Sequence, residues 1–146
     1  MKRILLVLGV VLAMATAASA DRLVSVNGER VNLRSGPGEN HAVLWELGNG
    51  YPLKVIGSEG KWLKVADFED DGGWIHADVT SRDPHLIVKK KVVNIRSGPG
   101  TKYKLVGKAN YGVVFKTLDH GANGWVKVEH ENGLKGWVLR NLLWGW

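Results

Sequence analysis

The sequence predicts an all-β protein built from two small, partly open β-barrels in tandem. The phrase VNLRSGPG at residues 31–38 returns as VNIRSGPG at residues 93–100, with seven of the eight positions identical. The motif WLKV at residues 62–65 returns as WVKV at residues 125–128, so the repeat continues downstream. Between these phrases, short stretches favouring strands are separated by turn residues about every eight to twelve positions, which is typical of small all-β folds.

The repeated phrase predicts a strand followed by a sharp turn. Val31 and Leu33 alternate with polar residues, the period of a strand with one buried face. Proline at the second turn position presets its φ, and glycine at the third accepts positive φ, so the pattern favours a type II turn. The structural turn residues are Gly36, Pro37 and Gly38 in the first repeat and Gly98, Pro99 and Gly100 in the second, with positive φ expected at Gly38 and Gly100.

The remaining elements follow from local signals. In the first repeat we expect, in order, a long loop at residues 39–49, a strand at 51–56, a turn at 57–60, and strands at 62–65 and 73–76. The acidic stretch 67–72 favours a solvated hairpin tip, because it lacks the ligand spacing of a calcium loop. In the second repeat, residues 85–88 predict the first strand, and Asn132-Gly133 predicts a type I′ hairpin turn.

The amino-terminal segment has the features of a secretory signal peptide. Lys2 and Arg3 precede an apolar run, and Ala18-Ser19-Ala20 matches an A-x-A cleavage site, whereas the uncharged stretch is at the short limit for a membrane anchor. The chain has no cysteine, so it forms no disulfide and offers no thiol for lipid attachment. We expect a signal peptide at residues 1–20 (Met1 to Ala20), domains at residues 21–80 and 85–146, and a periplasmic or secreted protein without stable membrane insertion.

Charge is distributed unevenly between the halves. Residues 21–80 hold six basic and ten acidic residues, a net charge of −4, whereas residues 81–146 hold twelve basic and four acidic residues, a net charge of +8. Either the opposite charges help the halves dock on each other, or the second half meets an anionic partner. The linker at residues 81–84 is short, so we expect the two domains to touch.

The order VNxRSGPG, loop, WxKV, hairpin, then GW before a hydrophobic residue resembles the bacterial SH3-like (SH3b) family. The resemblance covers both repeats, nearly the whole chain after the signal peptide. It implies two SH3-like barrels of five strands each, with one-turn 3₁₀ segments near residues 76–79 and 139–142. It also implies non-catalytic modules that bind wall components or peptides.

The candidate ligand-binding residues combine exposed rings with basic side chains. Trp62 and Trp125 alternate with core positions on their strands, so we expect both to be partly exposed. The resemblance to SH3-like domains implies that Trp125 forms the floor of a groove. The full candidate set is Trp62, Trp125, Tyr51, Tyr103, Lys102, Lys104 and Lys108. Interleaved basic and aromatic residues also suit single-stranded nucleic acid, but export disfavours that partner, so no nucleic acid is expected.

The residues give no support for catalysis. Ser35 and Ser97 lie in the repeated turn, and the five histidines lack a paired metal-ligand spacing, so we expect no catalytic residue, cofactor or metal.

The sequence therefore predicts an exported, non-catalytic module that binds peptidoglycan stem peptide or an envelope protein through SH3-like grooves. The alternative is a structural adaptor whose barrels pack together and scaffold a protein partner without a small ligand. An exposed Trp62 or Trp125 favours the module, and burial of both between the barrels favours the adaptor. The sequence does not indicate an oligomeric state.

Overall fold

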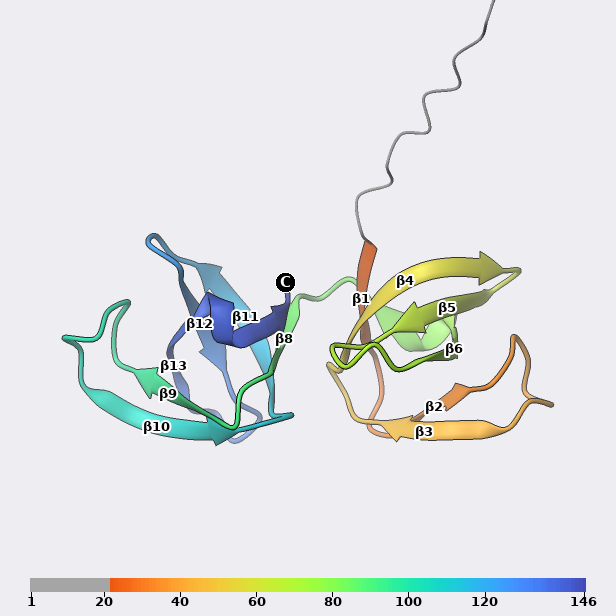
Figure 1. Ribbon diagram of the computed structural model, residues 1–146, viewed down its shortest axis with the longest axis horizontal. Coiled ribbons are helices and arrows are strands. Elements are labelled where there is room, and N and C mark those ends of the chain that lie inside the picture. Colours follow the sequence, from red (N-terminus) through yellow and green to blue (C-terminus); the bar gives the residue numbers. More distant parts are fainter. Residues whose placement is uncertain (1–21) are drawn as a thin grey trace, which may run out of the picture.

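Each repeat folds into its own antiparallel sheet. The computed structural model describes residues 22–146, so the predicted signal peptide lies outside the described residues (Figure 1). The first sheet has seven strands in the order β3-β2-β6-β5-β4-β1-β7, and the second has seven in the matching order β10-β9-β13-β12-β11-β8-β14. In both sheets the two end strands do not pair with each other, so each barrel is partly open. The expected all-β fold of two SH3-like barrels is confirmed.

The first sheet comprises β1 (Arg22–Val26), β2 (Val31–Arg34), β3 (Val43–Leu47), β4 (Pro52–Glu59), β5 (Trp62–Ala66), β6 (Gly72–His76) and β7 (Thr80–Ser81). The second comprises β8 (His85–Val88), β9 (Val92–Arg96), β10 (Leu105–Asn110), β11 (Val114–His120), β12 (Trp125–Glu129), β13 (Lys135–Leu139) and β14 (Leu143–Gly145). The 3₁₀ helices η1 (Ala77–Val79) and η2 (Arg140–Leu142) confirm the expected one-turn segments. In residues 22–146 no helix is long and apolar enough to cross a bilayer.

Three expectations about strands were wrong. The five strands implied by the resemblance become seven, because β1 and β8 each pair with a short late strand, β7 or β14. The predicted loop at residues 39–49 contains edge strand β3, and the predicted turn at residues 57–60 lies largely within β4, which continues to Glu59. Four of the five β3 side chains are exposed, so the strand carries no alternating pattern that the sequence could reveal.

Each barrel has a separate hydrophobic core. The first contains Val24, Val26, Val31, Leu33, Leu47, Leu53, Leu63, Val65 and Ile75. The second contains Leu86, Val88, Val93, Ile95, Ala109, Phe115, Val126, Val128, Val138 and Leu143. The alternating residues of the repeated VNxR phrase supply two members of each core, because residues two apart on a strand face the same side.

The Gly-Pro-Gly turn is not a type II turn. Gly38 N–H donates to the Gly36 carbonyl (2.9 Å), a three-residue γ-turn centred on Pro37, and His41 N–H donates to the Gly38 carbonyl (3.2 Å). In the second repeat, Gly100 N–H donates to the Gly98 carbonyl (2.9 Å) and Tyr103 N–H donates to the Gly100 carbonyl (3.2 Å). Neither Gly38 nor Gly100 has positive φ, so that prediction was wrong. Proline's fixed φ suits the centre of an inverse γ-turn, which explains why the residue recurs.

The turn after β12 also differs from expectation. Gly133 has positive φ (89°) but Asn132 does not, whereas a type I′ turn needs both. Gly133 N–H donates to the His130 carbonyl (2.9 Å) and His130 N–H to the Leu134 carbonyl (2.8 Å), which defines a three-residue loop with a bulge. The acidic hairpin tip has the same loop, with Asp70 at the positive-φ position (61°).

The two barrels touch, as the short linker predicts. The Ser25 hydroxyl donates to the Asp83 carbonyl (2.8 Å), and His85 Nδ1 lies 3.0 Å from the same hydroxyl. The Arg82 guanidinium donates to the Leu23 carbonyl and lies over the Trp146 ring, 5.8 Å from its centroid. These contacts tie the linker to the first strand of barrel 1 and to the end of barrel 2.

Candidate functional site

The loop before β10 is held by hydrogen bonds and exposes an aromatic ring. Ser97 N–H donates to the Lys104 carbonyl (2.8 Å), and Arg96 Nη1 donates to the Tyr103 carbonyl (3.1 Å). The Tyr103 ring lies against Gly98, where a Cβ atom would come within 2.4 Å of ring atom Cδ1. Tyr103 nevertheless remains 49% exposed. The glycine therefore provides the space that lets the ring lie flat on the turn with one face open to solvent.

The first barrel uses the same scaffold for a different side chain. Arg34 Nη1 donates to the Glu39 and His41 carbonyls (both 3.0 Å), and the His41 ring occupies the space over Gly36. The loop is thus common to both repeats, but it carries a histidine in one barrel and a tyrosine between two lysines in the other. The two barrels present different chemistry at the same place.

Basic side chains and exposed apolar ones continue from Tyr103 along β10. Lys102, Lys104 and Lys108 are all exposed, with Lys108 on the strand itself rather than in a loop. Leu105 and Val106 are 43% and 38% exposed on this edge strand. We call residues Lys102, Tyr103, Lys104, Leu105, Val106 and Lys108 the basic edge. It contains four of the seven predicted site residues.

The two predicted groove tryptophans differ in exposure. Trp62 is half-buried, and its ring packs edge-on against His76 with centroids 5.2 Å apart. Trp125 is buried, 9% exposed, so the expectation that it forms an exposed groove floor was wrong. Trp62 lies opposite His76 in the sheet register, whereas Trp125 lies opposite the apolar Leu139. The sequence repeat therefore conserves the tryptophan but not its surroundings.

Tyr51, the remaining predicted site residue, belongs to the contact between the barrels. Its hydroxyl donates to the Asp67 carboxylate (2.9 Å), and its ring lies 6.4 Å from Phe68. Phe68 in turn packs on Tyr111 of barrel 2, with ring centroids 5.3 Å apart. The hairpin tip at Asp67–Asp71 thus reaches the second barrel instead of standing free in solvent (Figure 1).

Burial and the acidic hairpin tip also affect the Tyr51 phenol. Desolvation by burial, followed by the hydrogen bond and charge of Asp67, raises the pKa of Tyr51 well above its ordinary value of 10.0. Tyr51 therefore stays neutral and able to donate at physiological pH.

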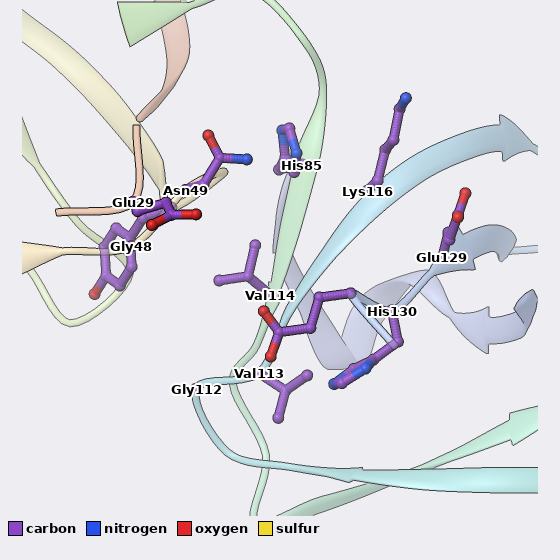
Figure 2. Close-up of a pocket in the computed structure, with 12 residues that line it drawn as sticks. Glu29, Gly48, Asn49, His85, Gly112, Val113, Val114, Lys116, Glu129 and His130 are labelled. Atoms are coloured by element: carbon purple, nitrogen blue, oxygen red, sulfur yellow. The ribbon is translucent and has the colours of Figure 1, made fainter. Parts of the chain in front are cut away.

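A cavity of about 720 Å³ lies between the barrels, here called the seam cavity. Figure 2 shows Glu29 and Asn49 of barrel 1 facing Val114, His85 and His130 across it. The full lining is Glu29, Gly48, Asn49, Tyr51, His85, Gly112, Val113, Val114, Lys116, Glu129, His130 and Glu131. The His85 ring closes one side by packing on Gly50, where a Cβ atom would lie 2.5 Å from ring atom Cδ2.

Sequence reasoning did not identify most of these seam residues. Phe68 and Tyr111 come from different repeats at positions that do not correspond, so no repeat pattern links them. Gly50 has positive φ (82°) and faces His85, but an isolated glycine in a loop carries no signal that distinguishes a turn from a close approach. The short linker and the opposite net charges of the two halves were the indications that the barrels would meet.

Comparison with known families agrees with the fold. Residues 27–81 and residues 91–143 each match a family described as bacterial SH3 domain. A protein of Bacillus subtilis (strain 168), named "Putative N-acetylmuramoyl-L-alanine amidase YrvJ", is 27% identical over 141 residues. The match covers 84% of this chain but 25% of that protein, so the chain spans about a quarter of the relative's length.

Solved structures with some likeness include NlpC2 from Trichomonas vaginalis, 17% identical with a TM-score of 0.38, covering 86% of this chain and 48% of that one. An NlpC/P60 family protein from Bacillus cereus ATCC 10987 is 16% identical with a TM-score of 0.37, covering 86% and 56% of the two chains.

Proposed function

Because the chain belongs to the bacterial SH3 domain family, with two such domains in tandem, we propose that it is a non-catalytic binding protein of the cell envelope. Its ligand is a peptidoglycan stem peptide, and the basic edge of barrel 2 is the surface that binds it. The relative named as an N-acetylmuramoyl-L-alanine amidase supports the choice of the cell wall as the setting. The predicted signal peptide supports a periplasmic or secreted location.

One observation carries the proposal: a half-exposed tyrosine ring is fixed on a braced turn between two exposed lysines. A ring already held in place loses little conformational freedom on binding, so its contact contributes more to affinity. Lys102, Lys104 and Lys108 offer charge to the free carboxylates of stem peptides, and Leu105 and Val106 offer an apolar surface to their side chains. The first barrel has His41 where barrel 2 has Tyr103, so we assign this site to barrel 2.

The role of Trp62 is a separate part of the proposal. It is half-buried beside His76, on the sheet face opposite the core, and shares that face with Lys64. A contribution from barrel 1 would therefore come from Trp62. Trp125, being buried, has no direct contact with ligand in this proposal.

Sedimentation with purified sacculi tests the function. We expect the protein to co-sediment at low ionic strength and to be released as salt rises toward about 1 M, because screening weakens exposed charge pairs. Tyr103→Ala should weaken binding roughly tenfold to thirtyfold, as expected for loss of a central aromatic contact. A protein that stays in the supernatant at low salt contradicts wall binding.

The adaptor function is the second candidate, and the contact between the barrels favours it. Phe68 packs on Tyr111, and the linker is tied to Ser25 through Asp83 and His85, so the pair can act as one unit. Sacculi binding distinguishes the candidates, because an adaptor without a small ligand would not sediment. In that case, capture of an envelope protein by the intact pair but not by separate halves would support the adaptor.

A further inference from the structure

We infer that the seam cavity is a second binding site, which takes a primary ammonium group carried on a short apolar stem. This inference is independent of the basic edge and of wall binding. The cavity volume of about 720 Å³ lies within the range of small-molecule sites, about 300–1,000 Å³. Both barrels contribute to its walls, so the complete site exists only in the intact pair.

The charge of the lining determines the class of ligand. Three carboxylates, Glu29 of barrel 1 and Glu129 and Glu131 of barrel 2, line the cavity with a single lysine, Lys116. The second half of the chain has only four acidic residues against twelve basic ones, and two of those four are here. The cavity is therefore acidic although the barrel that forms most of it is strongly basic. The basic edge would attract an anion and the seam cavity would repel it. A cation would be repelled by the basic edge and attracted to the seam cavity.

Within the part of the chain that the structure describes, these carboxylates have no charged partner. Among residues 22–146, neither Glu29, Glu129 nor Glu131 has a side-chain hydrogen bond or an ion pair. Lys116 lies opposite Glu129 in the β11–β12 register, yet the two do not form an ion pair. Glu29 and Glu131 are exposed and Glu129 is half-buried, and the three do not form one close cluster, so each carboxylate is separately available to accept from an ammonium donor.

The rest of the lining suits the apolar stem. Val113 and Val114 are half-buried on the barrel 2 side, and Tyr51 presents its ring from barrel 1. His130 Nδ1 accepts from Asn132 N–H (3.2 Å), which fixes the imidazole at the edge of the cavity. Figure 2 shows Val114 between the Glu29 and His130 sides of the cavity, so the apolar surface and the acidic groups face one space.

Titration with 1,5-diaminopentane, followed by backbone amide chemical shifts of the protein, tests the site. We expect saturable shifts at Gly48, Asn49, Gly112 and Val113, which line the cavity on its two sides. The diacetylated compound, which keeps the five-carbon stem but carries no charge, should cause no such shifts. Scattered shifts over all acidic surfaces, equal binding of the neutral compound, or no binding up to about 10 mM diamine would overturn the inference.

Three conservative variants complete the test. Glu29→Gln and Glu131→Gln remove one charge from opposite walls, and each should weaken diamine binding about threefold to tenfold. Glu46→Gln is the matched control, because Glu46 is an exposed glutamate on β3 that does not line the cavity. Glu29 and Glu131 line the cavity and Glu46 does not, and glutamine preserves the shape of each side chain, so folding should be unaffected. Equal weakening by Glu46→Gln would show a general charge effect and contradict the site.

Discussion

At the residue scale, the two glycines of each Gly-Pro-Gly turn have different roles. Gly98 is buried under the Tyr103 ring, whereas a Cβ atom at Gly100 would make only ordinary contact at 3.4 Å. Neither has positive φ, so backbone strain does not require glycine at either position. Glycine is needed at position 98 only because the Tyr103 ring occupies the space that a side chain would fill.

This difference predicts unequal effects of adding one methyl group. Gly98→Ala should lower the free energy of unfolding by about 1–3 kcal/mol, because the ring must move out of an overpacked position. Gly100→Ala should be close to neutral and serves as the matched control. Thermal or denaturant unfolding measures the stability of both variants. Equal destabilisation by the two changes would show that the backbone of the turn, rather than the space under the Tyr103 ring, requires glycine.

A second residue-scale prediction concerns the Tyr51 phenol. Its raised pKa in the folded state means that the neutral phenol contributes stability that is fully present below pH 10 and is lost as pH rises through the folded pKa. In an alkaline absorbance titration, wild type should retain one more un-ionised tyrosine than Tyr51→Phe at about pH 11, where an ordinary tyrosine is mostly ionised. Identical numbers of un-ionised tyrosines in the two proteins would contradict the buried hydrogen bond with Asp67.

At the element scale, the hairpin tip at Asp67–Asp71 is held by one carboxylate. Asp67 Oδ1 accepts from the Glu69 and Asp71 amides (2.9 and 3.0 Å), while Oδ2 accepts from Tyr51. Asp67→Ala should therefore lower the free energy of unfolding by about 1–3 kcal/mol, because it leaves three donors without their partner. Asp119→Ala, which changes an exposed aspartate of barrel 2 outside this hairpin, is the control. A neutral Asp67→Ala in denaturant unfolding would mean that water replaces these bonds without cost.

The sequence predicted the elements that have buried, alternating faces and missed those that do not. The strands at Leu63 and Val126 follow from alternating patterns in the repeat, and the one-turn 3₁₀ segments were implied by the family resemblance. The structure confirms both. Edge strand β3 was read as a loop because its exposed side chains follow no period. Turn types were wrong at Gly38 and Asn132 because the same residues suit several turns, and hydrogen bonds decide among them.

The candidate site was predicted in part for the same reason. Exposure of Tyr103 and its neighbouring lysines follows from local sequence, since charged residues flank the ring. Trp125 was misjudged because the burial of a strand residue depends on residues from other strands, such as Leu139 opposite it, and the local alternation does not reveal them. The seam cavity depends on contacts between repeats, such as Phe68 with Tyr111, and local patterns carry no information about those.

At the scale of the whole molecule, the contact between barrels predicts coupled stability. A double-mutant cycle on Phe68→Ala and Tyr111→Ala should give a coupling energy of about 0.5–1.5 kcal/mol, typical of an aromatic pair. Each isolated barrel should also melt below the intact pair, because domains of about 60 residues bury little surface on their own. Zero coupling, with halves as stable as the whole, would describe two independent domains and would remove the basis of the seam cavity.

Wall binding through the basic edge is the central functional claim, and one comparison of charge-matched variants tests it most directly. Lys102→Gln with Lys104→Gln removes two charges from the basic edge, and Lys90→Gln with Lys91→Gln removes two from exposed positions before β9. In sedimentation with sacculi at low salt, the first pair should weaken binding about tenfold, whereas the second should bind within about twofold of wild type. Equal losses from both pairs would show attraction governed by net charge alone and would contradict a defined site on the basic edge.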